Sequence, residues 1–321
     1  MGCQKKYLHL TELFNVKPRK GMKMLCKQHK LNYLVFALVL VGLLFSVPAY
    51  SAQKAKVRIG WTPWSGAEAV TTLAKQILEE KMDCEVELTM TAIGLQYQGL
   101  AKESLDVMLM SWLPETHKNY WDKFHADVVN LGAIYTRAHL GWVVPDYIPK
   151  TQLKSIEDLS KPEVAEKLKK TITGIDPGSG IMQASEKAME AYGLKDMGYY
   201  LVSASGAGMT ASLSKAIRNK EWIVVTGWKP HWKFAKWDLR FLDDPKSIFS
   251  RRERIHKLAR ENFYQETPVE VFNFFTRLYL PLEHIQKIML DASDMSYEEA
   301  IDKYIKEHPK RVNYWVTGQF E

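Results

Sequence analysis

The chain has 321 residues, 46% hydrophobic and 25% charged, which is typical of a globular protein with one or two cores and excludes a disordered chain. A formal net charge of +7 would suit an acidic partner. However, residues 1–52 hold eight of the 44 Lys and Arg but one of the 37 Asp and Glu, so the rest carries 36 of each. This balance argues against nucleic acid as a partner.

The N-terminal segment has the pattern of an export signal. A basic start leads into the apolar run LVFALVLVGLLFSVPAYSA at residues 34–52, which ends in small residues where a signal peptidase could cut. The run is short for a membrane span, although an uncleaved anchor is the alternative. Of three cysteines only Cys84 follows this segment, so no disulfide is expected within the mature chain. We expect residues 1–52 to be an extension and signal peptide, and the mature protein to be periplasmic and monomeric.

The first part of the mature chain alternates short apolar runs with helical patterns. This order predicts a βαβαβ unit with a parallel sheet. The runs in chain order are KVRIGW, AEAVTTLAKQILEEKM, CEVELTMTA, LQYQGLAKES and DVMLMSW.

The same alternation restarts after a Pro-containing stretch at 144–150, which reads as a crossing to a second lobe. From about residue 267 the pattern is helical. We predict two α/β lobes, each a mostly parallel sheet flanked by helices, over 53–143 plus 257–321 and over 144–256. The runs of the second series are TITGID, SGIMQASEKAMEAY, YYLVSASG, GMTASLSKAIRNK and WIVVTGW.

Three tryptophans close predicted strands at equivalent places: Trp61, Trp112 and Trp228, each followed within two residues by proline. Ligands of open α/β sheets sit beyond the carboxyl ends of strands. A single buried tryptophan is more often core, but three in this arrangement indicate a cleft lined by indoles. Such a cage favours a methylated quaternary ammonium ion, held by cation–π attraction. Trp232 and Trp237 are expected to pack instead.

The segment GIDPGSGI at 174–181 predicts a site for an anion in the second lobe. A turn precedes Ser179, a plausible N-cap, and the backbone amides of Gly180 and Ile181 open the following helix. Helix N-termini receive anions, although an ordinary strand-to-helix turn is the plain alternative. His117 in SWLPETHK could add a further N–H donor.

In order, the motifs GWTPW, SWLPETHK, TGIDPGSGI, SASGAGMTASL and VVTGWKPHW resemble the glycine betaine/proline betaine-binding proteins of osmoprotectant ABC transporters. The similarity runs over nearly the whole mature chain. It implies a two-lobed periplasmic-binding-protein fold of type II that closes around a betaine and delivers it to a membrane permease, without cofactor or metal. The ligand-binding residues it implies are Trp61, Trp112 and Trp228 as an aromatic prism, with His117, Gly180 and Ile181 at the carboxylate.

Other ligands and functions remain as alternatives. Choline or carnitine could replace betaine. Choline-binding relatives carry an acidic residue two positions after the first tryptophan, where this chain has Pro63, so a zwitterion is favoured. A hydrolase acting on a methylated amine is less favoured, because Ser179 lies in PGSG and not in a G-x-S-x-G motif, and no H-E-x-x-H occurs. For a nucleic-acid binder the relevant lysines are Lys229, Lys233 and Lys236, which we expect on the solvated face of a short helix.

Overall fold

The computed structural model describes residues 54–249 and 252–320. Residues Lys54–Glu321 belong to one compact unit. The predicted signal peptide and its cleavage site lie outside the described residues. Within the described part of the chain, no helix is both long and apolar enough to span a bilayer.

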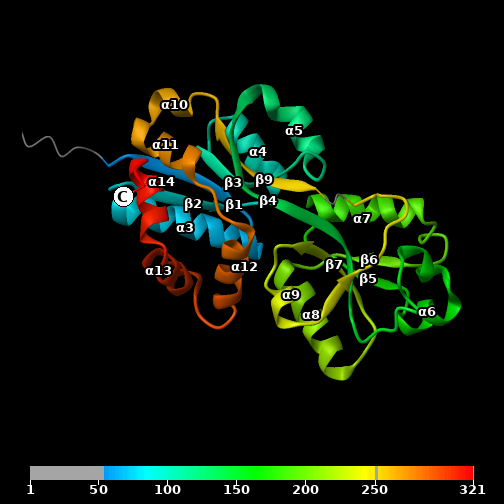
Figure 1. The fold of residues 1–321 in the computed structure, drawn as a ribbon. Helices are drawn as coiled ribbons and strands as arrows, with labels where there is room; N and C mark the ends of the chain where they lie inside the picture. The colour runs from blue at the N-terminus through cyan, green and yellow to red at the C-terminus, as the bar shows by residue number, and fades with distance from the viewer. Residues whose placement is uncertain (1–53, 250–251, 321) are drawn as a thin grey trace, which may run out of the picture. The chain divides into compact units, whose positions relative to one another are not determined.

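The first lobe begins with the predicted βαβαβ unit (Figure 1). Three residues of its first strand are buried, Val57, Ile59 and Gly60, as are all seven residues of its third strand. A strand buried on both faces is what a parallel sheet with helices on each side requires. The elements of this lobe are β1 (Lys56–Trp61), α3 (Ser65–Lys81), β2 (Glu85–Met90), α4 (Ile93–Ala101), β3 (Val107–Leu113), α5 (Lys118–Phe124) and η1 (His125–Asp127).

The second lobe repeats this arrangement with shorter strands. Its parallel strands are β5, β6 and β7, and α7 and α8 connect them. The elements are η2 (Ile156–Ser160), α6 (Pro162–Lys167), β5 (Thr171–Thr173), α7 (Gly180–Ala191), β6 (Tyr200–Val202), α8 (Gly206–Asn219), β7 (Val224–Lys229), α9 (Lys233–Lys236) and β8 (Leu239–Phe241).

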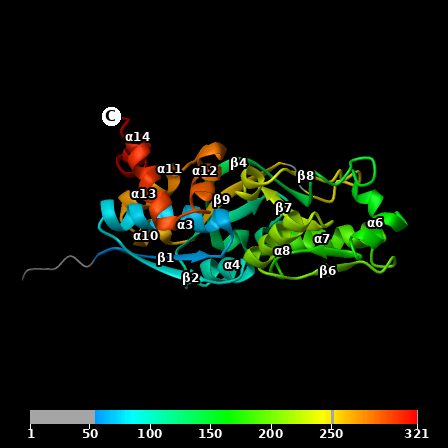
Figure 2. The ribbon, with the colours of Figure 1, turned by 90° about the horizontal axis from the view of Figure 1, so that it is seen from below.

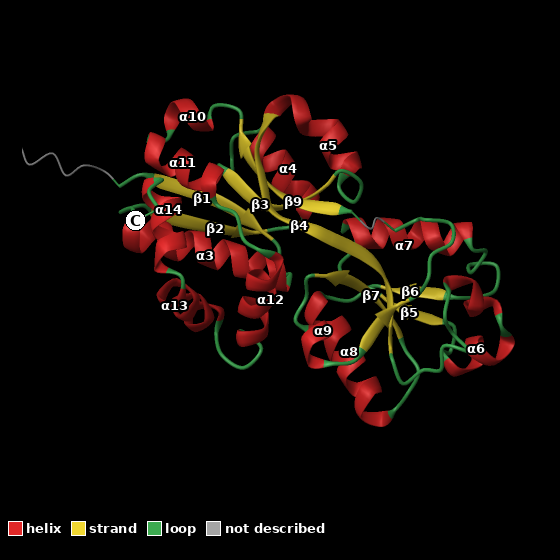
Figure 3. Ribbon diagram, viewed as in Figure 1, coloured by secondary structure: helices red, strands yellow, loops and turns green. Residues whose placement is uncertain are grey.

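Two strands that the sequence analysis did not anticipate join the lobes: β4 (Val128–Pro145) and β9 (Glu253–Arg260). The sheet runs β2-β1-β3-β9-β4-β7-β5-β6, and β4 and β9 are antiparallel to their neighbours. Figure 3 shows β4 continuing from the first lobe into the second. In each lobe, therefore, only the outer three strands are parallel to one another.

The first crossing lies within β4. Residues of β4 up to Ala138 pair with β9, and residues from His139 pair with β7. The Pro-containing stretch at 144–150 marks the end of the strand instead, because proline cannot donate a hydrogen bond to a sheet. The second crossing leads back to the first lobe before β9, since β9 pairs with β4 from Glu253 onward.

The helical tail predicted from about residue 267 is present and packs on the first lobe. The helices α12, α13 and α14 contact α3, and α11 contacts β4. In Figure 2, α13 and α14 lie on the same side of β1 and β2 as α3. Ser296 starts α13 with a capping box that includes Glu299, a favoured helix N-terminus. The tail comprises α10 (Phe263–Glu266), α11 (Val269–Arg277), α12 (Leu282–Asp291), α13 (Tyr297–Glu307) and α14 (Pro309–Thr317).

Candidate functional site

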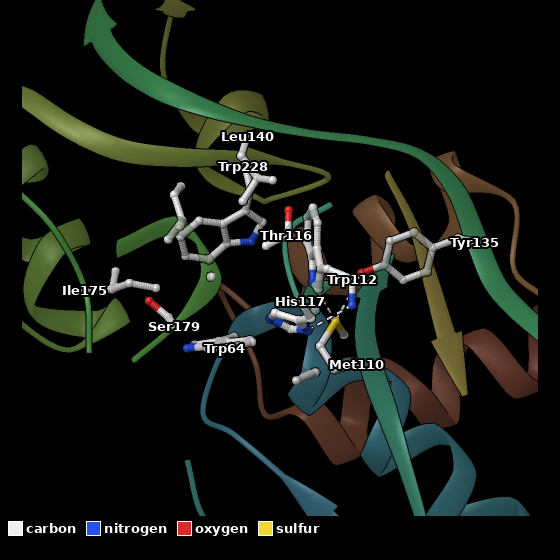
Figure 4. Close-up of a pocket in the computed structure, with 14 residues that line it drawn as sticks. Trp64, Met110, Trp112, Thr116, His117, Tyr135, Leu140, Ile175, Ser179 and Trp228 are labelled. Carbon is white, nitrogen blue, oxygen red and sulfur yellow. Dashed lines mark hydrogen bonds between the residues drawn. The ribbon is translucent and has the colours of Figure 1, made fainter. Parts of the chain in front are cut away.

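A pocket lies between the two lobes at the carboxyl ends of their parallel strands. No Lys, Arg, Asp or Glu is among the described residues that line it, and most of its wall is carbon. In Figure 4 the rings of Trp64, Trp112 and Trp228 border a common space, with His117 and Ser179 beside it. The lining residues are Trp64, Gly66, Ala67, Met110, Trp112, Thr116, His117, Tyr135, Leu140, Ile175, Ser179, Gly180, Ile181 and Trp228.

The first tryptophan of the wall is Trp64, where the sequence analysis expected Trp61. Trp61 is the last residue of β1, pairs with Met90 and is half-buried outside the pocket lining. Thr62 and Pro63 turn the chain, so that the residue immediately before α3 is the one that reaches the cleft. The indole Nε1 of Trp64 donates to Asp176 Oδ1 in the second lobe at 2.8 Å. Both tryptophans stand in GWTPW; the strand-end position and the resemblance indicated Trp61, whereas Trp64 is the one that lines the pocket.

Trp112 and His117 are held together by two reciprocal hydrogen bonds. The backbone N–H of Trp112 donates to His117 Nδ1 at 3.0 Å, and the backbone N–H of His117 donates to the Trp112 carbonyl at 2.9 Å. His117 is buried, which lowers its pKa to about 3, so the ring is neutral at physiological pH. Because Nδ1 accepts, the ring proton resides on Nε2, which can donate to a ligand.

Trp228 in β7 supplies the third indole and is 6% exposed. The edge of His231 lies against it, with ring centroids 4.9 Å apart. As expected, Trp232 and Trp237 lie outside the pocket lining and pack against each other at 5.4 Å. The expectation for the neighbouring lysine was wrong: Lys233 is fully buried, and its ammonium lies over the Trp228 ring, 4.4 Å from the centroid.

The predicted anion site has free backbone amides. Ser179 occupies the N-cap position of α7, but its hydroxyl donates to the Asp176 carbonyl and makes no cap bond. Within the described residues, the N–H groups of Gly180 and Ile181 have no recorded acceptor. A Cβ at Gly180 would lie 2.3 Å from Thr116 Cγ2 and 2.5 Å from the Thr116 carbonyl oxygen. The two lobes therefore approach closely only because residue 180 is glycine.

Further contacts join the lobes around the pocket. The Tyr120 hydroxyl in α5 donates to the Gly178 carbonyl at 2.7 Å, and Gln183 in α7 donates to both groups. Gly178 has φ +83°, which glycine adopts without strain. Within the first lobe, Glu253 at the start of β9 accepts from the backbone N–H and hydroxyl of Thr116. These contacts bring Trp112, Trp228, His117, Gly180 and Ile181 together, as predicted, with Trp64 in the place of Trp61.

The lining offers both neutral aromatic faces and N–H donors. Such a pocket can hold a diffuse cation together with an anion. Among the described residues, no group of three or more His, Cys, Asp or Glu is placed to hold a metal ion.

Two α/β lobes joined by crossing strands, with a pocket at the facing strand ends, define a binding protein of the type II periplasmic class. Comparison with known families agrees. The model for the substrate-binding domain of ABC-type glycine betaine transport systems matches residues 55–307, and the chain belongs to this family.

Individual relatives were found in both sequence and structure. A protein of Listeria monocytogenes named glycine betaine/carnitine transport binding protein GbuC is 40% identical over 160 residues, 50% of this chain. The aligned region spans only about half of that relative, 53% of its length. The lactococcal OpuAC, solved with glycine betaine in its closed form, is 35% identical with a TM-score of 0.75, covering 82% of this chain and all of that one. A glycine betaine/L-proline-binding protein, ProX of Borrelia burgdorferi, is 32% identical with a TM-score of 0.76, covering 83% and 98%.

Proposed function

We propose that this protein captures glycine betaine or a related betaine between its lobes and delivers it to an ABC transporter permease. The observation that carries the proposal is the pocket itself: three indoles from two lobes border a space that no charged side chain of the described residues lines. A methylated ammonium has no N–H to donate, so carboxylates are not needed to hold it. Cation–π attraction supplies roughly 2 kcal/mol or more at such a desolvated site.

The carboxylate end of the ligand is assigned to three donors. The free amides of Gly180 and Ile181 lie at the N-terminus of the 12-residue helix α7, whose dipole favours an anion. His117 Nε2 adds a third donor. The ligand thus brings one charge to each end of the pocket, which explains why the protein needs no charged side chain there.

The division into lobes follows the pocket. We place residues 53–143 with 257–321 in one lobe and 144–256 in the other, except that residues 139–143 pair with β7 of the second lobe and residues 253–256 pair with β3 and β4 of the first. Trp64, Trp112 and His117 belong to the first lobe, and Gly180, Ile181 and Trp228 to the second. A ligand that contacts both lobes stabilises their closed arrangement, which couples binding to closure. Small-angle scattering should show compaction when betaine is added.

Location and partners complete the proposal. Residues 1–52 comprise an extension and a signal peptide, and the mature chain acts in the periplasm as a monomer that presents its closed form to the permease. It performs no catalysis, so the ligand is recovered unchanged after prolonged incubation with the purified protein.

A calorimetric panel tests the ligand assignment. Glycine betaine, proline betaine, carnitine, choline and ectoine are titrated into the mature protein, and the betaines should bind most tightly. Carnitine is the main competitor, because the Listeria relative is named for it. Binding of none of the five would overturn the proposal.

A further inference from the structure

A buried lysine lies behind one wall of the pocket. Lys233 has 0% exposure, yet among the described residues its ammonium forms no ion pair with a carboxylate. Its Nζ donates to the Thr226 carbonyl at 3.2 Å and lies over the Trp228 ring. A buried charge without a counter-ion is costly, so its position calls for an explanation.

The side of the indole on which Lys233 lies follows from the pocket lining. Trp228 lines the pocket and Lys233 does not, although its Nζ is 4.4 Å from the ring centroid. The ammonium is therefore on the face of Trp228 turned away from the pocket. A ligand cation in the pocket would meet the other face of the same ring.

We propose that Lys233 is a specificity-determining residue that disfavours ligands with an unbalanced positive charge and so selects betaines over choline. This inference rests on the proposed function and names how the same site discriminates between ligands. Lys233 and a ligand cation repel each other through Trp228 in a region that water does not screen. A betaine carries its own carboxylate, whose attraction to Lys233 offsets much of that repulsion. Choline has no such group.

The other rings of the cage show that this arrangement is particular to Trp228. Trp64 has the opposite charge beside it, since its N–H donates to the Asp176 carboxylate. Trp112 donates to the uncharged Met110 sulfur at 3.3 Å. Discrimination against a net positive ligand is thus assigned to the Trp228 wall alone.

A change of pH provides a second way to remove the charge of Lys233. Burial lowers the pKa of its ammonium to about 7, so its charge is lost as pH rises from 6.5 to 8.5. His231 beside it has a pKa far below its ordinary value, again because of burial, and stays neutral over this range.

Other charged and titratable side chains lie on α9, on the turn before it and on the helix packed against it. Lys229 lies over the Phe234 ring and Lys236 over the Trp232 ring. Helix α12 packs against α9, and its charged or titratable side chains are Glu283, His284, Lys287 and Asp291. Lys287 pairs with Asp291, and His284 has a lowered pKa.

The test compares glycine betaine and choline affinities for the wild type, Lys233→Met and Lys236→Met by calorimetry. Methionine fills a similar volume without charge, and Lys236→Met removes a nearby exposed charge as a matched control. At pH 6.5 we expect Lys233→Met to reduce the preference for betaine about fivefold to tenfold, mainly through tighter choline binding. Lys236→Met should leave the preference within about twofold.

The wild type gives an independent answer if Lys233→Met does not fold. Its preference for betaine should be several-fold smaller at pH 8.5 than at pH 6.5, and in Lys233→Met it should not change with pH. A preference that neither the substitution nor the pH alters would overturn the inference, even with betaine bound tightly. A wild type that binds neither ligand would instead overturn the proposed function.

Discussion

The two lobes use the same scaffold positions for opposite purposes. Each has three parallel strands in which the first lies between the second and third: β2-β1-β3 in one lobe and β6-β5-β7 in the other. In both, the third strand brings a tryptophan to the pocket, Trp112 or Trp228, and a cis peptide precedes the proline two residues later. The lobes differ at the turn after their first strand.

That turn decides which groups each lobe presents at the start of its following helix. After β1 the residue before the helix is Trp64, which presents an aromatic face. After β5 the corresponding residue is Ser179, followed by Gly180, and the turn presents bare backbone amides. The first turn thus presents an aromatic face and the second presents N–H donors, while the second lobe also supplies the Trp228 ring and the first lobe the His117 ring. The same topology presents an aromatic face at one turn and bare amides at the other because its two copies carry different side chains at one position.

The largest effect on betaine affinity is expected from filling the space at Gly180, in the turn after β5. Gly180→Ala places a methyl group against Thr116 of the first lobe and should weaken betaine binding about tenfold to a hundredfold by preventing closure. Gly206 is also the first residue of its helix, but the nearest atom to its added Cβ is 3.8 Å away. Gly206→Ala is therefore the matched control. Equal affinities of the two variants would contradict the close approach of the lobes.

The first turn is tested by its two tryptophans. Trp64→Ala removes an aromatic face from the pocket and should cost about tenfold in betaine affinity. Trp61→Ala, on the adjacent strand end, should leave affinity within about twofold, since Trp61 does not line the pocket. Calorimetry with thermal melts separates lost binding from lost folding. If Trp61→Ala weakened binding more than Trp64→Ala, Trp61 would be the tryptophan of the aromatic prism.

The anion end is tested by the ligand preference of His117 variants. His117→Ala removes one donor for a carboxylate and should reduce the preference for glycine betaine over choline about fivefold. It also leaves the Trp112 amide without its acceptor, so stability should fall as well. His117→Gln keeps an acceptor and a donor and should restore part of the preference. An unchanged preference in both variants would remove His117 from the carboxylate site.

The smallest effect concerns the contact between α5 and the second turn. Tyr120→Phe removes the hydroxyl that donates to the Gly178 carbonyl, and betaine should dissociate about twofold to fivefold faster from the less stable closed form. Stopped-flow tryptophan fluorescence measures the rate. Tyr200→Phe, at a residue 69% exposed on β6, serves as the control. Equal dissociation rates would show that this hydrogen bond does not hold the lobes closed.

Much of this arrangement could be predicted from the sequence. Apolar runs with the periods of strands and helices predicted both βαβαβ units and the C-terminal helices, because local patterning determines such elements. The strand-end positions of Trp112 and Trp228, and the glycine at the start of α7, were predicted for the same reason. The sequence pattern was sufficient to predict a residue's position wherever that position depended on a single helix or strand.

The tertiary structure decided what depended on contacts between distant segments. Nothing within GWTPW shows that Trp64 enters the pocket, since its partner Asp176 lies 112 residues further along. The strands β4 and β9 were missed because each is completed by pairing with the other, and β4 serves both lobes. Lys233 has the pattern of a solvated residue on a short helix, and only the packing of that helix behind Trp228 buries it. Burial is a property of the neighbours that folding brings together, which no single segment of the chain contains.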